Sequence, residues 1–297
     1  MTATRDSASD RHFRSFCYVF ITILLLFVMY PLLYVLSASV SDPAMVASGK
    51  VILLPKGFTL EGYRRVFQDK NILTGYANTI FYTVVGTLIN LITTVPAGYA
   101  LARRTLPGRR LLTVYFMIPM YFSGGLIPTF LLVNQIGLYN TRAIMVLIYA
   151  FNMYYCIICR TFFDSMPKEM EEAAIIDGCT PFQTFFRVIL PLSKALIGVM
   201  VLFFAVEQWN TYFAAMIYLR DQDKYPLQLV LRKILVLEQT SAEMLSNAGE
   251  SAAAANFQLK ELLKYAVIVV SSLPVLIIYP FVQKYFEQGV MIGSVKG

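Results

Sequence analysis

Few side chains in this 297-residue chain have the types and spacing that catalysis requires. The single histidine, His12, lies in a polar N-terminal stretch, so a histidine general base has no candidate partners. Cys156 and Cys159 form a C-x-x-C pair inside an apolar segment, with no second cysteine pair or nearby histidine, which predicts packing residues and no metal site. The phosphate-binding pattern G-x-x-x-x-G-K-[ST] is missing, and residues 48–50 are only a fragment of it. We therefore expect a non-enzyme that binds no cofactor of its own.

The chemistry that the residues do offer is ligand binding. Glu207-Gln208-Trp209-Asn210 lies in an otherwise apolar stretch, where polar groups are costly unless they pair or face water. An indole can stack on the ring of a ligand while the flanking amides bind polar groups of that ligand, so these four residues are a candidate substrate path. Asn152 and Tyr154 form a second, weaker set. The alternative interpretation is that these groups join helices through hydrogen bonds or lie at the membrane interface.

A polar cassette, Glu172–Pro191, separates two long apolar segments. Its first helix carries Glu169, Glu171 and Glu172 in the opening turn, where the helix dipole favours negative charge. Ser165 is the expected N-cap of this helix. Gly178 is the expected residue of positive φ just past its end, where the chain turns.

A second helix is predicted to follow the turn. Thr180 and Gln183 have the spacing of a capping box, and Pro181 occupies the first helical position between them. Leu190-Pro191 is predicted to end the helix. Its i, i+3, i+4 and i+7 positions form one apolar stripe that needs a partner surface: Phe182, Phe185, Phe186 and Ile189.

The spacing of the cassette resembles the EAA loop of ABC importer permeases. Glu172-Ala173-Ala174 is followed by three residues, Gly178, nine residues, Val188, one residue and Leu190-Pro191; Val188 stands where isoleucine is commoner. The lead-in, residues 162–171, and the tail, residues 283–297, resemble the carbohydrate-uptake branch, to which the maltose permease subunits belong.

The resemblance implies partners and sites. The partners are a second permease subunit in a heterodimer, two ATPase subunits that carry ATP and Mg, and an extracytoplasmic solute-binding protein. Tail residues Gly293, Ser294 and Lys296 are expected to contact the ATPase. The long loop at residues 220–264 resembles a subgroup that takes complex oligosaccharides and polysaccharide fragments. The residues expected to couple to the ATPase are Glu172, Ala173, Ala174, Asp177, Gly178, Phe182, Phe185, Phe186, Leu190 and Pro191.

Composition independently indicates a membrane protein. Hydrophobic residues make up 57% of the chain and charged residues only 14%, whereas soluble domains carry about 25% charged residues. A membrane-spanning helix needs about 20 mostly apolar residues. Six segments meet this need, so we expect an all-α integral membrane protein with six transmembrane helices: residues 16–40, 71–102, 111–141, 143–163, 195–219 and 265–283.

The distribution of arginine predicts the orientation in the membrane. Arg103, Arg104, Arg109 and Arg110 crowd the connection after the second span, whereas the connection after the third holds only Arg142. Since short cytoplasmic loops are rich in Lys and Arg, the former connection, both termini and the cassette are expected on the cytoplasmic side of a bacterial cytoplasmic membrane. Because the basic residues flank spans, the net charge of +7 indicates membrane lipid, and no nucleic acid, as the partner.

This topology divides the chain into four parts. Residues 1–15 are a cytoplasmic tail, and residues 16–70 hold the first span, interpreted as an uncleaved anchor because it exceeds a signal-peptide core, with an external loop. Residues 71–290 are the permease core, with the cassette loop at about 164–192 and the external loop at about 220–264. Residues 291–297 are the cytoplasmic tail.

The resemblance implies a permease subunit of an ATP-driven, binding-protein-dependent importer of oligosaccharides or polysaccharide fragments, which couples ATPase motion to alternating access. An importer of another solute class is the nearest alternative. An ion-coupled secondary carrier would use Glu207 as its coupling carboxylate and leaves the cassette without a role. A structural membrane scaffold predicts no transport.

Overall fold

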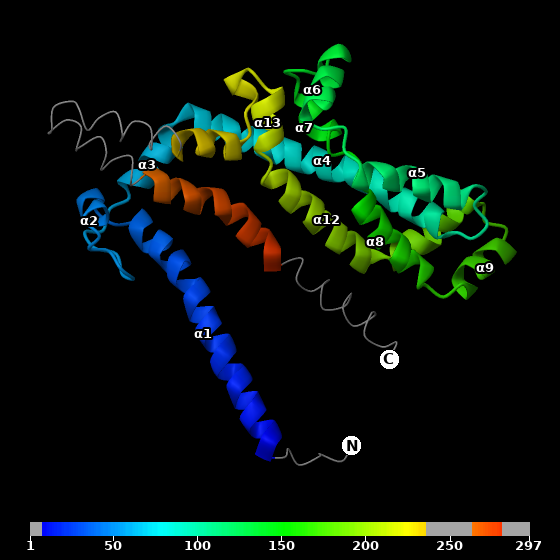
Figure 1. The fold of residues 1–297 in the computed structure, drawn as a ribbon, viewed down its shortest axis with the longest axis horizontal. Helices are drawn as coiled ribbons and strands as arrows, with labels where there is room; N and C mark the ends of the chain where they lie inside the picture. Colours follow the sequence, from blue (N-terminus) through cyan, green and yellow to red (C-terminus); the bar gives the residue numbers. More distant parts are fainter. Residues whose placement is uncertain (1–7, 236–262, 281–297) are drawn as a thin grey trace. The chain divides into compact units, whose positions relative to one another are not determined.

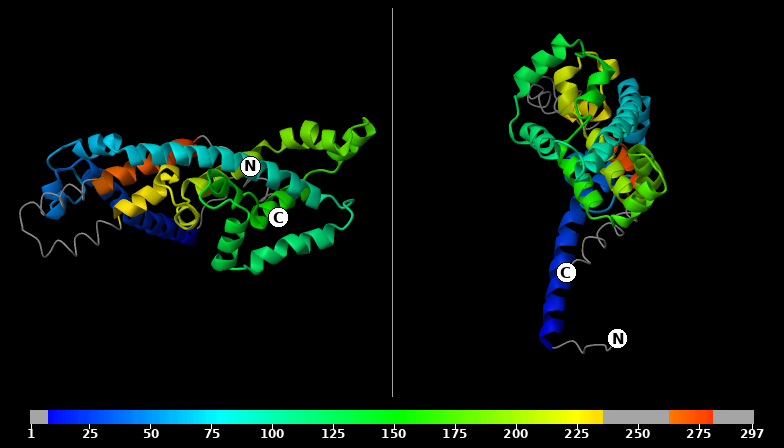
Figure 2. Two further views of the ribbon diagram at one scale, coloured as in Figure 1. Left: turned by 90° about the horizontal axis from the view of Figure 1, so that it is seen from above. Right: turned by 90° about the vertical axis from the view of Figure 1, so that its right-hand side faces the viewer.

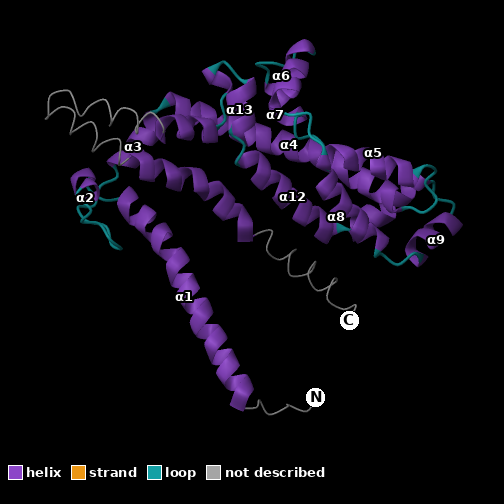
Figure 3. Cartoon of the chain, in the orientation of Figure 1, coloured by secondary structure: helices purple, strands orange, loops and turns teal. Residues whose placement is uncertain are grey.

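The computed structural model describes residues 8–235 and 263–280, and all regular structure within them is helical (Figures 1 and 3). The tail residues Gly293, Ser294 and Lys296, and residues 236–262 of the predicted external loop, lie outside the described residues. The described chain divides into two compact units. One holds α1 to α3 and residues 263–272; the other holds residues 70–233 and 273–280.

The first unit is built around the long helix α1 (Ala8–Ser39), followed by the short helices α2 (Pro43–Ala47) and α3 (Glu61–Gln68). None of the most apolar stretch of α1 is buried within the protein. A helix that exposes apolar side chains all round is stable in lipid and not in water. The small core of this unit contains Ala38, Val46 and Val51, with Tyr34 and Tyr265 packed against it.

The second unit is organised along α4 (Lys70–Ala102), beside which α8 and α12 pack (Figures 1 and 2). Between α4 and α8 (Met153–Asp164) lie three shorter helices, α5 (Arg109–Tyr121), α6 (Leu126–Gln135) and α7 (Arg142–Leu147). After α8 come the elements of the cassette: α9 (Glu169–Ile176), α10 (Pro181–Gln183), a π-helix (Thr184–Ile189) and α11 (Leu190–Leu192). The order then continues with α12 (Lys194–Trp209), α13 (Phe213–Tyr218), a 3₁₀ turn (Gln222–Lys224) and a helix over residues 227–235.

Small residues allow the close approach of α4 to its neighbours. A Cβ atom on Gly98 would lie 2.4 Å from Cβ of Cys159 in α8, and one on Gly86 would lie 2.5 Å from Nε2 of Gln208 in α12. Because lipid supplies little hydrophobic drive between helices, such close packing is a main source of helix association in membranes.

The predicted spans are only partly continuous helices. In the described residues, three helices are long and apolar enough to cross a membrane: Asp10–Ser39, Lys70–Ala102 and Leu263–Pro280. The segment predicted to span over residues 111–141 is instead α5 and α6, which meet at 112°. The segment predicted over residues 195–219 is divided into α12 and α13, and α12 also meets the cassette helix Pro181–Leu192 at 82°.

The span predicted over residues 143–163 is interrupted between α7 and α8. The hydroxyl of Thr93 donates to the carbonyl of Ala150, and the amide of Asn90 donates to the carbonyls of Tyr149 and Ala150. Non-helical backbone at membrane depth needs such partners. Two polar side chains of α4 therefore stabilise an interruption that an apolar sequence does not reveal.

The start of the predicted external loop is bound to α4. The Asn78 amide donates to the carbonyls of Asp223 (2.7 Å) and Tyr225 (3.1 Å), and Thr79 Oγ1 accepts from the Leu227 N–H at 2.8 Å. Tyr82 donates to the Lys224 carbonyl at 2.8 Å. Residues 223–227 are thus held along the first part of α4.

Asn140 binds the residues just before this segment. It adopts a φ of +57°, a conformation that asparagine tolerates better than most residues. Its side-chain oxygen accepts from the N–H groups of Arg220 and Asp221, and its amide donates to the Asp221 carboxylate at 2.8 Å. Hydrogen bonds from Lys224 and from Asn140 lower the pKa of Asp221.

Candidate functional site

The turn of the cassette has the predicted geometry at Gly178. Its φ is +78°, its N–H donates to the Ile175 carbonyl at 3.0 Å, and the Cys179 N–H donates to the Ala174 carbonyl at 2.9 Å. These are the two hydrogen bonds of a Schellman motif, which glycine favours because it has no Cβ atom. The prediction that α9 ends at this glycine is confirmed.

The prediction that Ser165 is the N-cap of α9 is wrong. Ser165 instead terminates α8, and its hydroxyl donates back to the Phe162 carbonyl at 2.7 Å. Lys168 precedes α9 and makes no side-chain capping bond. The helix before the cassette extends to Asp164, and α9 begins four residues after Ser165, so the serine lies outside the cap position.

The predicted capping box at the second limb is confirmed. The Thr180 N–H donates to the Gln183 side-chain oxygen at 2.9 Å, and the Gln183 N–H donates to Thr180 Oγ1 at 3.3 Å. Two N–H groups of a helix start are thereby satisfied reciprocally.

The predicted apolar stripe does not form one face, because residues 184–189 are a π-helix. The wider π turn changes the angle between successive side chains. Phe185 and Ile189 are buried, at 5% and 4% exposed, while Phe182 is 71% exposed and Phe186 is 44% exposed. The helix also runs one residue past the predicted end, to Leu192.

The candidate coupling residues divide into a buried and an exposed group. Ala174 and Phe185 are buried and Leu190 is partly buried, so these three hold the cassette together. Ile176 is 85% exposed and Ile175 is 53% exposed, so both belong to the exposed group. Neither was predicted from the sequence as a site residue, although two adjacent isoleucines in a polar helix indicate an apolar contact surface. The exposed candidates are Glu172, Ala173, Asp177, Gly178, Phe182, Phe186 and Pro191.

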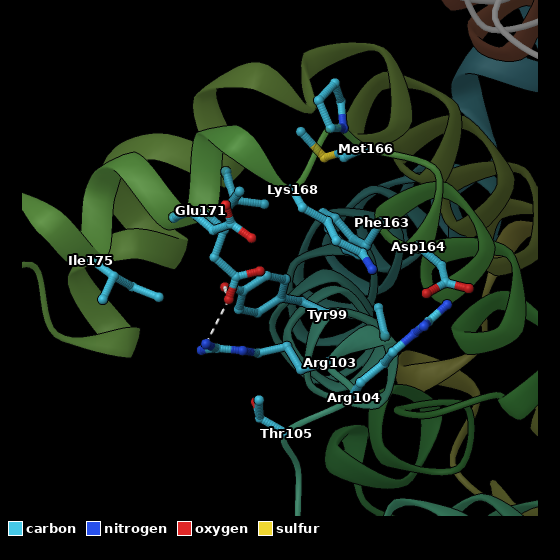
Figure 4. A pocket seen from close by; sticks show the side chains of 14 residues that line it. Tyr99, Arg103, Arg104, Thr105, Phe163, Asp164, Met166, Lys168, Glu171 and Ile175 are labelled. Carbon is cyan, nitrogen blue, oxygen red and sulfur yellow. Dashed lines mark hydrogen bonds and ion pairs between the residues drawn. The ribbon is translucent and has the colours of Figure 1, made fainter.

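The cassette contacts the end of α4 through charged side chains that sequence reasoning also missed as a site (Figure 4). Nη2 of Arg103 lies 2.6 Å from Oε1 of Glu171, and the Tyr99 hydroxyl donates to the same oxygen at 3.3 Å. The Arg103 guanidinium lies 5.7 Å from the centre of the Tyr99 ring, within the range of a cation–π interaction. A cavity of about 280 Å³ opens beside this junction, lined in part by Arg104, Lys168 and Glu172.

The candidate substrate-path residues are not gathered on one surface. Gln208 and Trp209 are buried: Gln208 lies against Gly86, and the Trp209 ring packs edge-on to Tyr76 with centres 5.8 Å apart. The side-chain amide of Gln208 has no hydrogen-bond partner among the described residues. Both residues therefore face α4.

Glu207 is partly buried, and its carboxylate lies close to Tyr155 of α8. Asn152 is exposed and accepts from the Tyr154 N–H at 2.9 Å as the N-cap of α8, and Tyr154 is 54% exposed. Asn210 is exposed, with its amide bound to the Val206 carbonyl. The structure thus brings Glu207 to α8 and separates it from Gln208 and Trp209.

The described residues contain no group of three or more His, Cys, Asp or Glu side chains arranged to hold a metal ion. Cys156 and Cys159 are buried and unpaired in α8, with Cys159 packed against Gly98.

Long apolar helices interrupted by a polar helix-turn-helix are typical of the membrane subunit of a transporter. The chain belongs to the family described as "Binding-protein-dependent transport system inner membrane component", whose model matches residues 1–292. This family has a six-helix membrane permease fold, which confirms the predicted fold class. The subunit is a non-catalytic component of a transporter complex.

Named relatives cover almost the whole chain. Protein LplC of Bacillus subtilis is 41% identical over 90% of this chain and 89% of its own length. The polygalacturonan/rhamnogalacturonan transport system permease protein YtcP of the same organism is 38% identical over 97% of this chain and 99% of its own. Among solved structures, a bacterial ABC transporter involved in the import of the acidic polysaccharide alginate matches with a TM-score of 0.84 and 38% identity, covering 96% of this chain and 100% of that chain.

Proposed function

We propose that this chain is one permease subunit of an ATP-driven importer for oligosaccharides or polysaccharide fragments, with fragments of acidic polysaccharides as the first candidates. Two relatives at 38% identity support this substrate class, because one is named for polygalacturonan and rhamnogalacturonan and the other for alginate. Relatives named for diacetylchitobiose and for arabinooligosaccharides, at 27% and 26% identity, support oligosaccharides more broadly.

The observation that carries the coupling role is the exposed apolar surface of a rigid, doubly capped cassette. Ile176, Phe182 and Phe186 are large and exposed on it, and the arginines near the spans favour the aqueous, cytoplasmic side for it. Exposed apolar residues with polar neighbours are typical of a protein–protein interface. A helix seated in a groove of an ATPase subunit can pass rigid-body motion to the spans.

The remaining assignments follow from this role. A second permease subunit, in a heterodimer, completes the pathway; two ATPase subunits hold ATP and Mg; and an extracytoplasmic binding protein delivers the sugar. Both termini are cytoplasmic. The exposed or partly exposed polar residues Glu207, Asn210, Asn152 and Tyr154 are the better candidates for the sugar path, and Gly293, Ser294 and Lys296 for a tail contact with the ATPase.

Co-purification tests the coupling role directly. Membranes containing this chain, tagged, together with its candidate permease and ATPase partners should yield a complex whose ATPase activity rises about tenfold or more when loaded binding protein is added, as expected for coupled sites. Replacing both Phe182 and Phe186 by Ser should remove the ATPase while the two permease subunits stay together. An ATPase that co-purifies equally with the variant would contradict the docking role of this surface.

A further inference from the structure

We propose that α4 is the lever on which the cassette acts, and that the Arg103–Glu171 ion pair, braced by Tyr99, is the joint between them. This inference rests on the proposed coupling role and identifies the positioning residues within it. The joint consists of the Arg103 and Glu171 side chains and the Tyr99 ring (Figure 4).

The joint is the direct contact between α4 and a cassette that lies far from it in the sequence. The cassette follows α8 and precedes α12 in the chain, so its movement reaches those two helices through the backbone. The end of α4 lies 67 residues before the start of α9, since α4 ends at Ala102 and α9 begins at Glu169. α4 therefore follows the cassette through side-chain contacts, directly at this joint and indirectly through its packing against α8 and α12.

The Arg103 and Tyr99 side chains converge on one carboxylate oxygen of Glu171. Oε1 of Glu171 lies 2.6 Å from Nη2 of Arg103 and accepts a hydrogen bond from the Tyr99 hydroxyl at 3.3 Å. The Arg103 and Glu171 side chains are only 20% and 27% exposed, so water screens their attraction less than it would at an open surface. A charge-assisted bond of this kind is stronger than a neutral one and holds a fixed geometry.

Tyr99 also contacts the other limb of the cassette. Its ring lies 4.9 Å from that of Phe185 in the π-helix and 5.5 Å from that of Phe163 in α8. Hence the end of α4 touches α9 through Glu171 and the π-helix through Phe185. A rotation of the cassette as a body would move both contacts together.

The other contacts of α4 show which segments would move with it. The helix has 33 residues, which corresponds to about 50 Å. Near its middle, Asn90 and Thr93 bind the interrupted segment at Tyr149 and Ala150. Near its start, Asn78, Thr79 and Tyr82 bind residues 223–227. One helix thus connects the cassette to the break between α7 and α8 and to the start of the external loop.

Removing the charge of Glu171 tests the joint in the assembled complex. Glu171→Gln keeps the shape of the side chain and should leave co-purification of the ATPase at the level of the parent. Sugar uptake per ATP hydrolysed should fall about tenfold, within the range of coupling between linked sites. Glu169→Gln is the matched control, since it changes an exposed glutamate of the same helix turn and should leave this ratio unchanged.

A charge exchange separates transmission from simple structural support. The pair Arg103→Glu with Glu171→Arg restores opposite charges and should recover uptake per ATP to within about threefold of the parent, because the attraction depends on the charges and not on their order. Unchanged uptake in Glu171→Gln would overturn the proposal. So would loss of the ATPase from Glu171→Gln with no recovery in the charge exchange.

A cysteine next to residues 223–227, which α4 binds near its start, reports whether this segment moves with the nucleotide state. Gln222 is exposed beside the bound segment, and Gln222→Cys is introduced after the four native cysteines are replaced by Ala. Its labelling rate should differ about threefold or more between ATP-bound and nucleotide-free complexes, a shift expected if two states exchange. Glu171→Gln should abolish the difference. If the labelling rate of the parent were the same with and without ATP, the lever proposal would be contradicted. A parent complex that lacks ATPase or sugar uptake would instead contradict the proposed function.

Discussion

Gly178→Asp is expected to leave the protein in the membrane and to abolish the coupling of ATP hydrolysis to sugar uptake. Gly178 lies at φ +78°, and a Cβ atom added to it would have no neighbouring atom within 4 Å, so a side chain would project outward from the turn. A carboxylate there would lie beside Asp177 and the carbonyl end of α9, where negative charge is unfavourable. Burying it in an ATPase groove would add a desolvation penalty, so uptake should fall below about one-tenth of the parent's, which corresponds to about 1.4 kcal/mol or more.

Gly178→Asn separates charge from backbone strain in this experiment. Asparagine has nearly the size of aspartate and tolerates a positive φ, so its uptake should stay within about threefold of the parent, the effect expected for a lost glycine alone. Uptake and ATPase stimulation would be measured in liposomes with loaded binding protein. If Gly178→Asp and Gly178→Asn lost uptake equally, or if Gly178→Asp coupled hydrolysis to uptake normally, the docking of this turn in an ATPase groove would be contradicted.

Gly98→Val is expected to produce the largest loss of stability in the permease core. A Cβ on Gly98 would lie 2.4 Å from Cys159 Cβ, and near two backbone atoms of α8, Arg160 N at 3.1 Å and Cys156 O at 3.2 Å. Backbone atoms cannot rotate away, so α4 and α8 would have to separate. Overpacking costs about 1–3 kcal/mol, and contacts with backbone atoms favour the upper end of this range. The loss is measurable as a lower unfolding temperature in detergent and a smaller folded fraction on size exclusion.

The control for this substitution is Gly124→Ala. Gly124 has no atom within 4 Å of the added carbon and no positive φ, so its stability should change by less than about 0.5 kcal/mol. If Gly98→Val unfolded at the same temperature as Gly124→Ala, the claim that α4 packs closely on α8 at Gly98 would be contradicted.

Local chemistry made the ends of the cassette helices predictable. The Schellman turn at Gly178 and the capping box of Thr180 and Gln183 use residues within five positions of one another, so their sequence pattern contains all the partners. Ser165 failed as a cap because it ends α8, while α9 begins only at Glu169 and has Lys168 at its N-cap position. Where two helices compete for one serine, the local pattern does not decide between them.

The π-helix shows why the apolar stripe was wrong. Pro191 has no N–H and its ring would clash with the carbonyl four residues earlier in a regular α-helix. The backbone widens instead, and the Leu190 N–H donates to the Phe185 carbonyl, five residues back. A stripe drawn with α-helical spacing then assigns Phe182 and Phe186 to the same face as the buried Phe185 and Ile189.

Long-range pairs account for what the sequence did not reveal. Arg103 was counted only as a sign of membrane orientation, yet it binds Glu171, 68 residues away. Asn90 and Thr93 looked like ordinary polar residues of a span, whereas they bind the carbonyls of an interruption near residue 150. Hydropathy reports how apolar a segment is, but it does not report which side chain of another helix can satisfy its backbone.

Sugar uptake by the reconstituted complex, with ATP and ion gradients varied separately, is the most direct test of the central claim. Liposomes containing this chain, its partner permease and the ATPase would receive binding protein and a labelled oligosaccharide on the outer face and ATP on the inner face. The proposed function predicts that uptake requires ATP hydrolysis and continues when ionophores abolish all gradients. Uptake that proceeds without ATP and stops when the gradients are abolished would contradict it and would identify an ion-coupled carrier.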